Sequence, residues 1–245
     1  MSFEAPLGRG NSISDFYREQ AKSYSEFSEV SFSWRYIERP AFDRHLGDLY
    51  KADMQTLDAG CGSGRTIQHL IDRGINPTNI IGLDLSLDML KIAAKKLPGV
   101  KLIQTDLADA PLPHERFDLV TSSMVFHYLD ESGLQRTLDN FHRLLRNGGV
   151  LFYVVTHPVR MVSTNLAEYQ TSGWRRSSTP WGADSPFFHR KTADILNATL
   201  NAGFTIEVVD EPPVSKEGEQ ADPQEYQKYI SYGASRLVVR AKKNF

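Results

Sequence analysis

Short apolar runs alternate with helical periodicity over the middle of this 245-residue chain. The apolar runs predict strands at about residues 55–59, 79–84, 100–105, 117–122 and 149–156. Between them, apolar residues at helical spacing predict helices near 64–73, 87–97 and 131–146. Because regular strand–helix alternation favours parallel strands joined by right-handed crossovers, we expect a parallel α/β sheet.

The pattern is weaker at both ends of the chain. Residues 11–36 carry many aromatic residues, and Asp15 is a possible helix cap there; a helix is expected at 41–50. Residues 157–190 are aromatic but not periodic, and an irregular stretch of this length is commonly functional, so we expect a cover over a substrate site. The remaining segments predict a helix at 192–202, a strand at 204–210, a polar surface loop at 211–221 and a last strand at 233–241.

A glycine-rich turn, Asp58-Ala59-Gly60-Cys61-Gly62-Ser63-Gly64, follows the first strand. Its alternate glycines let the backbone bend sharply and approach a ligand closely. Asp84 ends the next strand about 20 residues after Gly64, the spacing at which an acid meets ribose hydroxyls in nucleotide-binding folds. A dinucleotide fingerprint would require glycine in place of Arg65, so a nicotinamide cofactor is disfavoured.

The turn resembles motif I of the class I S-adenosylmethionine-dependent methyltransferases, in particular the small-molecule type. The strand that ends at Asp84, with Ser86 as the next helix cap, the strand before Asp106 and the segment Phe117–Tyr128 follow in the family's order. The resemblance implies a doubly wound, Rossmann-like α/β fold. Its seven-stranded sheet is mostly parallel, the last strand is antiparallel, and helices cover both faces.

The resemblance also implies a division of the chain. Residues 1–45 would form a helical cap over the active site, 46–156 the cofactor-binding core, 157–190 the substrate-covering insertion, and 191–245 the remainder of the core.

The resemblance implies S-adenosyl-L-methionine as the cofactor. Ligands of open parallel sheets bind beyond the carboxyl ends of the strands, so we expect the cofactor there. Asp84 would bind the ribose hydroxyls, and Asp106 the adenine amino group. The expected cofactor-binding residues are Tyr17, Tyr24, Asp58, Gly60, Gly62, Gly64, Asp84, Leu85, Met89, Asp106, Leu107, Ser122 and Ser123.

The expected reaction is methyl transfer to a small organic acceptor through an O, N or C nucleophile, by in-line displacement. A base is required only if the nucleophile must lose a proton, and His127 and His157 are the candidates because they follow strands. The expected substrate-binding residues are Phe126, Tyr128, Trp174, Trp181 and His189. Each histidine could instead bond only a backbone carbonyl, and each aromatic residue could only fill the core.

Composition narrows the choice of partners. A net charge of −2 without a basic block argues against nucleic acid, and the apolar runs are too short for a membrane span. A single cysteine and the lack of a signal-like start predict a cytoplasmic protein. The seven histidines show no metal-ligand spacing, so no metal is expected.

Two alternatives stay open on the sequence. One is a protein that binds S-adenosylmethionine without catalysis, and the other is a methyltransferase that acts on protein or RNA. The sequence leaves the oligomeric state undetermined.

Overall fold

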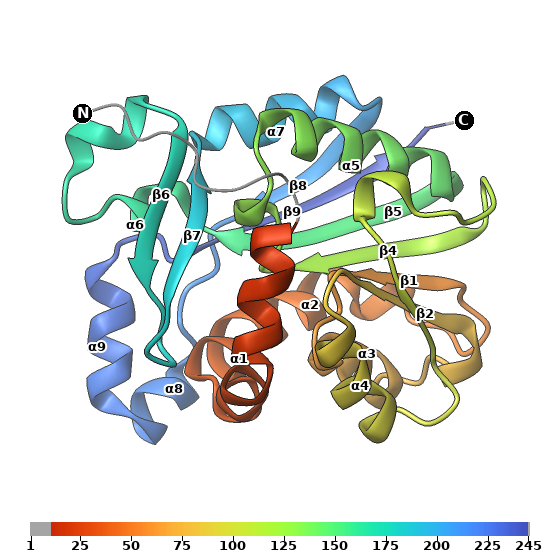
Figure 1. The fold of residues 1–245 in the computed structure, drawn as a ribbon, viewed down its shortest axis with the longest axis horizontal. Helices are drawn as coiled ribbons and strands as arrows, with labels where there is room; N and C mark the ends of the chain where they lie inside the picture. Colours follow the sequence, from red (N-terminus) through yellow and green to blue (C-terminus); the bar gives the residue numbers. More distant parts are fainter. Residues whose placement is uncertain (1–10, 245) are drawn as a thin grey trace.

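The computed structural model describes residues 11–244, and a seven-stranded sheet forms the centre of this part of the chain (Figure 1). The strand order is β3-β2-β1-β4-β5-β9-β8. β9 is antiparallel to both of its neighbours, and the other pairs are parallel, which confirms the predicted fold class. In sheet order the strands are Lys101–Gln104 (β3), Ile80–Asp84 (β2), Thr56–Ala59 (β1), Phe117–Ser123 (β4), Leu145–Thr156 (β5), Arg236–Lys243 (β9) and Phe204–Asp210 (β8).

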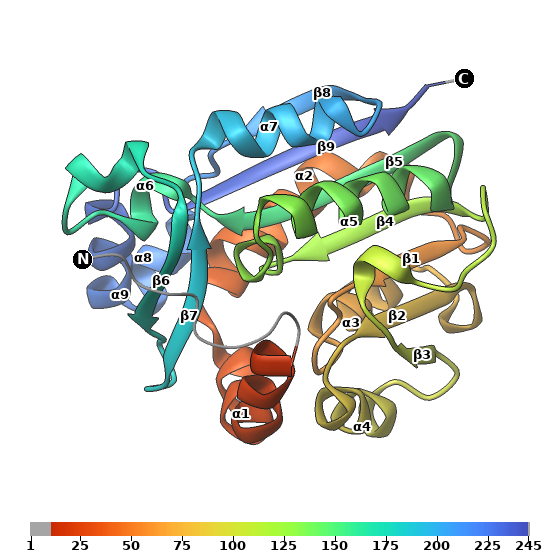
Figure 2. The same cartoon turned by 45° about the horizontal axis from the view of Figure 1, so that its top comes forward.

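Helices cover both faces of this sheet (Figures 1 and 2). Neighbouring residues of β5 point to opposite faces, so Phe152 belongs to one apolar cluster and Tyr153 to the other. The cluster with Phe152 includes helices α2, α3 and α4, and the cluster with Tyr153 includes α5 and α7. These helices are Arg39–Leu46 (α2), Arg65–Asp72 (α3), Leu87–Lys96 (α4), Glu131–Leu144 (α5) and Thr192–Asn201 (α7).

The predicted core elements agree with the structure to within a few residues at most ends. β5 begins earlier than expected because Leu145 already pairs with Phe117. Ser86 caps α4 as predicted, since its side chain accepts the Met89 N–H.

The prediction of a surface loop at 211–221 is wrong for its second half. Helix α8 spans Lys216–Ala221, and helix α9, Pro223–Ser231, follows it. The side chain of Asp222 accepts two backbone N–H groups at the start of α9, and Tyr229 of α9 is buried. This short, polar segment has too few apolar residues to show helical periodicity.

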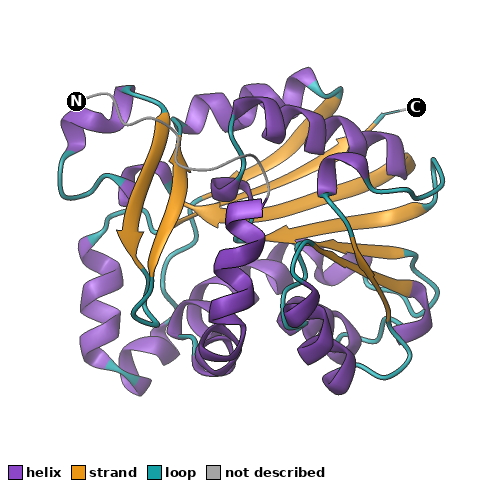
Figure 3. Cartoon of the chain, in the orientation of Figure 1, coloured by secondary structure: helices purple, strands orange, loops and turns teal. Residues whose placement is uncertain are grey.

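The non-periodic insertion has more regular structure than its sequence suggests. It contains helix α6, Pro158–Met161, a 3₁₀ turn at Leu166–Gln170, and a hairpin of β6, Gly173–Ser178, and β7, Asp184–His189. The hairpin is a separate two-stranded sheet, drawn beside the main sheet in Figure 3.

Helix α1, Asn11–Val30, stands beside this hairpin and in front of the carboxyl ends of β4 and β5 (Figure 1). Asp15 lies inside the helix, so its expected role as a cap is wrong. Trp181, at the hairpin tip, packs against the rings of Tyr24 and Phe27 at centroid distances of 5.1 and 5.4 Å. We call helix α1 and the β6–β7 hairpin together the lid.

A buried ion cluster joins three distant segments behind the lid. Glu38 is 1% exposed and accepts hydrogen bonds from Arg236 on β9 at 2.8 Å and from Arg65 on α3 at 3.2 Å. The Arg65 guanidinium also lies 4.5 Å from the ring centre of Trp34. Burial by itself raises the pKa of Glu38, but the two guanidinium groups outweigh it and leave this pKa below its usual value. Arg65, the residue that argues against a dinucleotide loop, thus has a structural role.

Replacing Glu38 with Gln should lower the free energy of unfolding by about 3–5 kcal/mol, because two guanidinium groups then stay buried without a counter-charge. Urea unfolding followed by circular dichroism measures the loss. The control is Glu26→Gln, which removes an exposed carboxylate 4.0 Å from Lys22 and should cost less than about 1 kcal/mol. Equal losses in the two variants would contradict this account of the cluster.

Candidate functional site

The glycine turn after β1 has a backbone that other residues would strain. Gly60, Gly62 and Gly64 have φ values of 76°, 53° and 90°. A Cβ on Gly60 would lie 2.3 Å from the Val125 side chain, and one on Gly64 would lie 2.3 Å from Leu97. Both positions therefore require glycine for their backbone conformation and for space.

The carboxylate of Asp84 holds this turn in place. Its Oδ2 accepts the Gly62 N–H at 2.8 Å, and its Oδ1 accepts the Ser86 N–H at 2.8 Å. Burial raises the pKa of Asp84, and the backbone N–H groups of Ser86, Gly62 and Leu85 oppose that rise. One acid thereby fixes both the turn after β1 and the start of α4.

Asp58 lies below the turn and is 1% exposed. Its Oδ1 accepts a hydrogen bond from the Thr121 hydroxyl at 2.8 Å, and its Oδ2 has no partner among the described residues. Burial raises the pKa of Asp58 to about 7. Asp58 thus links β1 to β4 just before the turn.

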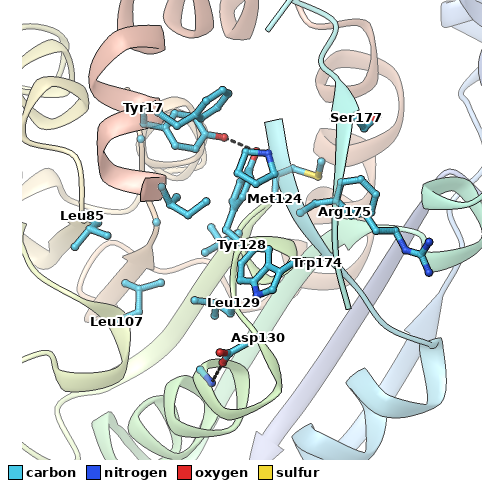
Figure 4. Close-up of a pocket in the computed structure, with 18 of the residues that line it drawn as sticks. Tyr17, Leu85, Leu107, Met124, Tyr128, Leu129, Asp130, Trp174, Arg175 and Ser177 are labelled. Atoms are coloured by element: carbon cyan, nitrogen blue, oxygen red, sulfur yellow. Dashed lines mark hydrogen bonds between the residues drawn. The ribbon is translucent and has the colours of Figure 1, made fainter. Parts of the chain in front are cut away.

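A cavity of about 1140 Å³ opens at these strand ends (Figure 4). Gly60, Gly62 and Asp84 line one part of it, and residues of the insertion, Trp174 among them, line another. In Figure 4, Leu85 and Leu107 lie together toward one side, while Tyr128 and Trp174 lie near the middle. The turns after the parallel strands, the start of α5, the insertion and α1 thus enclose one continuous space.

Two tyrosines meet across this cavity. The Tyr17 hydroxyl donates to the Tyr128 hydroxyl at 2.6 Å, which joins α1 to the segment after β4. Burial raises the pKa of Tyr128 to about 12, and it raises the pKa of Tyr17 well above its usual value. Both phenols therefore stay protonated near neutral pH, and the Tyr17 proton is engaged in the bond to Tyr128.

The segment after β3 forms the apolar side of the cavity. Asp106 caps the 3₁₀ turn Leu107–Asp109, because its Oδ1 accepts the Ala108 N–H at 2.9 Å. Leu85 and Met89 line the cavity together with Asp106 and Leu107. This side combines apolar side chains with one carboxylate.

The structure brings most of the predicted site residues to this one cavity. The predicted residues that line it are Tyr17, Tyr24, Gly60, Gly62, Asp84, Leu85, Met89, Asp106, Leu107, Ser123, Tyr128 and Trp174. The predicted residues that do not line it are Asp58, Gly64, Ser122, Phe126, His127, His157, Trp181 and His189.

The predicted residues outside the cavity support it in different ways. The Ser122 hydroxyl donates to the Ala59 carbonyl at 2.9 Å, and Phe126 is buried against Tyr153. Trp181 contacts α1 from the hairpin tip, so it belongs to the lid contact rather than to the cavity wall.

Neither candidate base reaches the cavity. His157 is 4% exposed; its Nδ1 accepts the Val159 N–H, and its Nε2 therefore donates to Glu211 at 2.9 Å. His127 and His189 line a separate space of about 20 Å³, and burial lowers the pKa of His127 to about 3. Their positions after strands were readable from the sequence, but the direction of each side chain was not.

The sequence analysis missed several cavity residues, of which Met124 is the most informative. Met124 follows β4 directly and has a φ of 63°, a conformation that is uncommon outside glycine. Its N–H bonds to the Val154 carbonyl at 2.8 Å, which holds the strained residue at the cavity wall. Backbone strain of this kind has no sequence signal. Three arginines of the cavity wall were also missed: Arg136, which lies in the predicted helix 131–146, and Arg175 and Arg176, which lie in the irregular segment. Charged residues at such positions are expected to face solvent, and Arg136 and Arg176 are exposed.

Comparison with known proteins gives the family. Residues 56–149 match the model of a family described as a methyltransferase domain. The chain is 30% identical over 235 residues to an uncharacterized protein of Haemophilus influenzae, covering 84% of this chain and 87% of that protein. It is 36% identical over 107 residues to a malonyl-[acyl-carrier protein] O-methyltransferase of Hamiltonella defensa, covering 44% of this chain but only 39% of that relative.

A solved S-adenosylmethionine-dependent methyltransferase from Mesorhizobium loti shares the fold with a TM-score of 0.68 at 25% identity, covering 88% of this chain and all of that one. The chain belongs to the S-adenosylmethionine-dependent methyltransferases. It is an enzyme, and S-adenosylmethionine is its cofactor.

The site itself fits this cofactor. The nearest atom to a Cβ built on Gly62 is Tyr24 Cε1 at 3.7 Å, so the turn is open on the side of the cavity. Ser123 also lines the cavity, and its buried hydroxyl has no partner among the described residues.

In the described part of the chain, no helix combines the length and apolar character that a membrane crossing requires.

Replacing Asp84 with Asn should weaken S-adenosylmethionine binding about 10- to 150-fold. The reason is that hydrogen bonds to a charged group contribute about 1.5–3 kcal/mol, which corresponds to this change in the dissociation constant. Titration calorimetry measures the dissociation constant, and thermal unfolding checks that the turn still forms. Asp88→Asn is the control, because Asp88 lies in the first turn of α4, close in sequence to Asp84, and pairs with Lys91 at 2.9 Å. Unchanged affinity in Asp84→Asn would show that this acid does not bind the ribose.

Proposed function

We propose that this enzyme transfers a methyl group from S-adenosylmethionine to a small organic acceptor by in-line displacement. The observation that carries the proposal is the single cavity of about 1140 Å³, which joins the glycine turn to the aromatic and cationic wall of the insertion. A cofactor and a small acceptor would share this space, with the transferred methyl group between them.

Each part of the cofactor has a matching surface. Asp84 would accept the ribose hydroxyls, and Asp106 would accept the adenine amino group. Leu85, Met89 and Leu107 would pack on the faces of the purine. The open side of the turn at Gly62, with Tyr24 above it, would hold the amino-acid end.

The chain contributes orientation and exclusion of water. When bound, S-adenosylmethionine supplies an electrophilic methyl group on a positively charged sulfur. Water stabilises that charge more than the dispersed charge of the transition state, so the lid, which covers the cavity, should favour transfer. Correct alignment alone can supply about 7–11 kcal/mol. Because neither His127 nor His157 lines the cavity, we assign the role of a base to neither histidine.

The lid supports an acceptor that fits inside the cavity. Tyr17 bonds to Tyr128, and Trp181 packs on Tyr24 and Phe27, so α1 and the hairpin close over the same space. A relative is named for an acceptor bound to a carrier protein, and such an acceptor would have to enter as an extended arm. The same arrangement favours treating residues 11–45 as part of the cap predicted for 1–45, of which residues 1–10 lie outside the described part of the chain, and 157–190 as the substrate cover. We also infer a cytoplasmic location from the single cysteine.

The direct test incubates the purified enzyme and S-adenosylmethionine with a small-molecule extract, followed by mass spectrometry. We expect one or a few metabolites to gain the mass of a CH₂ group. If only protein or RNA becomes methylated, the small-acceptor proposal is wrong. If nothing is methylated although the cofactor binds, the alternative of a non-catalytic binder is favoured.

Replacing Trp181 with Ala should lower turnover of the extract's acceptor at least about tenfold, while cofactor affinity changes less than about threefold. The reason is that loss of this partly buried aromatic contact loosens the lid, although Trp181 itself does not line the cavity. Initial rates and calorimetry measure the two quantities. Leu200→Ala, an exposed leucine on α7, is the control. Full turnover in Trp181→Ala would remove the hairpin from the function.

A further inference from the structure

Guanidinium groups gather at the part of the cavity that the cofactor residues leave open. Arg136 lines it from the second turn of α5, and Arg175 and Arg176 line it from β6. Asp130, at the start of α5, and Glu168, in the insertion, also line the cavity, so the charge that a ligand meets depends on which of these groups are already paired.

The arginines of the hairpin already have anionic partners. Arg175 pairs with Glu168, and Arg176 bonds to Asp184 at 2.6 Å. Arg136 has no ion pair or hydrogen bond with any described residue, although its side chain lines the cavity. Of the three cationic side chains in this wall, Arg136 is thus the one whose charge the described residues leave uncompensated.

Two further polar groups in the same wall have no partner. The Nε of Arg175 is buried and makes no hydrogen bond with a described residue. Thr137, next to Arg136 on α5, is 0% exposed, and its hydroxyl is also without a partner. Buried polar groups are normally satisfied, so these two point to a ligand that accepts hydrogen bonds.

Most carboxylates that line the cavity are already bonded to backbone N–H groups or to arginine, and the exposed Glu19 of α1 is the exception among the described residues. Asp130 accepts the Gly133 N–H at 2.7 Å, as Asp106 does for Ala108 and Asp84 for Gly62. An acceptor that is already deprotonated in solution suits such a wall, because no group of the wall has to remove a proton from it. A carboxylic acid has a pKa of about 4 and is therefore deprotonated at neutral pH.

We propose that the methyl acceptor is a carboxylate, that Arg136 recognises its charge with the help of the Arg175 Nε–H, and that the product is a methyl ester. This inference rests on the proposed small-acceptor function. A carboxylate oxygen donates a lone pair to the methyl carbon, and the C–O bond forms as the C–S bond breaks. The electron pair of the C–S bond stays on sulfur. Both products are uncharged at the reacting groups, and no proton is released.

The chemical nature of the product tests the proposal. The enzyme is incubated with S-adenosylmethionine tritiated in its methyl group and a small-molecule extract, and protein and nucleic acid are removed. Alkali hydrolyses methyl esters to methanol, so we expect most of the label to become volatile. Label that survives alkali as an N-, C- or ether-linked methyl group overturns the carboxylate. No label in the small-molecule fraction instead overturns the proposed function itself.

Arg136→Gln tests the recognition residue. With limiting extract, formation of alkali-labile label should fall about tenfold or more, and excess extract should restore much of it, as expected for weakened acceptor binding. Affinity for S-adenosylhomocysteine, measured by calorimetry, should stay within about twofold. Lys95→Gln removes one exposed positive charge on α4 and serves as the control. If Arg136→Gln behaves like this control, Arg136 does not bind the acceptor.

Discussion

One hydrogen bond organises the functional end of this protein: the Gly62 N–H to the Asp84 carboxylate, at 2.8 Å. The turn after β1 needs positive φ at three glycines, and such a backbone is stable only if its N–H groups find acceptors. The carbonyl of Leu83 accepts the N–H groups of Gly60 and Cys61, and Asp84 accepts that of Gly62. The end of β2 therefore shapes the turn of β1, which the parallel register of the two strands makes possible. The same acid faces the cavity, so the turn and the acid can be positioned only together.

The parts of the site that depend on local chemistry were predictable from the sequence. Glycine spacing, the acid that ends β2 and the Ser86 cap each have a local cause, and the structure places Gly60, Gly62, Asp84 and Asp106 on one cavity. The direction of a side chain after a strand end has no such cause, and His157 illustrates this, because its ring caps α6 instead of entering the cavity. The hairpin and α9 were missed for a related reason. Their stability comes from tertiary contacts such as those of Trp181 and Tyr229, not from a periodic pattern of their own.

Access to the cavity and its closure depend on the same contacts. The bond between the Tyr17 and Tyr128 hydroxyls crosses the cavity, so a large acceptor can pass there only if this bond breaks. A single neutral hydrogen bond contributes about 1 kcal/mol net, which is small enough to open thermally. The contact of Trp181 with α1 is apolar and contributes more. The ion cluster of Glu38 is not part of the lid. It joins Arg65 of α3 to Arg236 of β9. Helix α1, however, contacts the glycine turn directly, because the Ser28 hydroxyl lies 3.3 Å from that of Ser63 and Tyr24 lies beside Gly62. Opening of the lid at α1 would therefore change the contacts of this turn, whereas opening at the hairpin would not.

With the proposed carboxylate acceptor, the charges along the cavity would favour binding of the reactants and release of the products. A carboxylate at the exposed Arg136 would meet a fixed charge of opposite sign, and the sulfonium cation would share the cavity with the fixed negative charge of Asp84. Transfer of the methyl group removes both ligand charges at once. The fixed charges of Asp84 and Arg136 then attract neither reacting group, and an ester and a thioether are held mainly by apolar contacts. Because the charges that assemble the two reactants vanish in the reaction, the arrangement that favours the reactants does not retain the products.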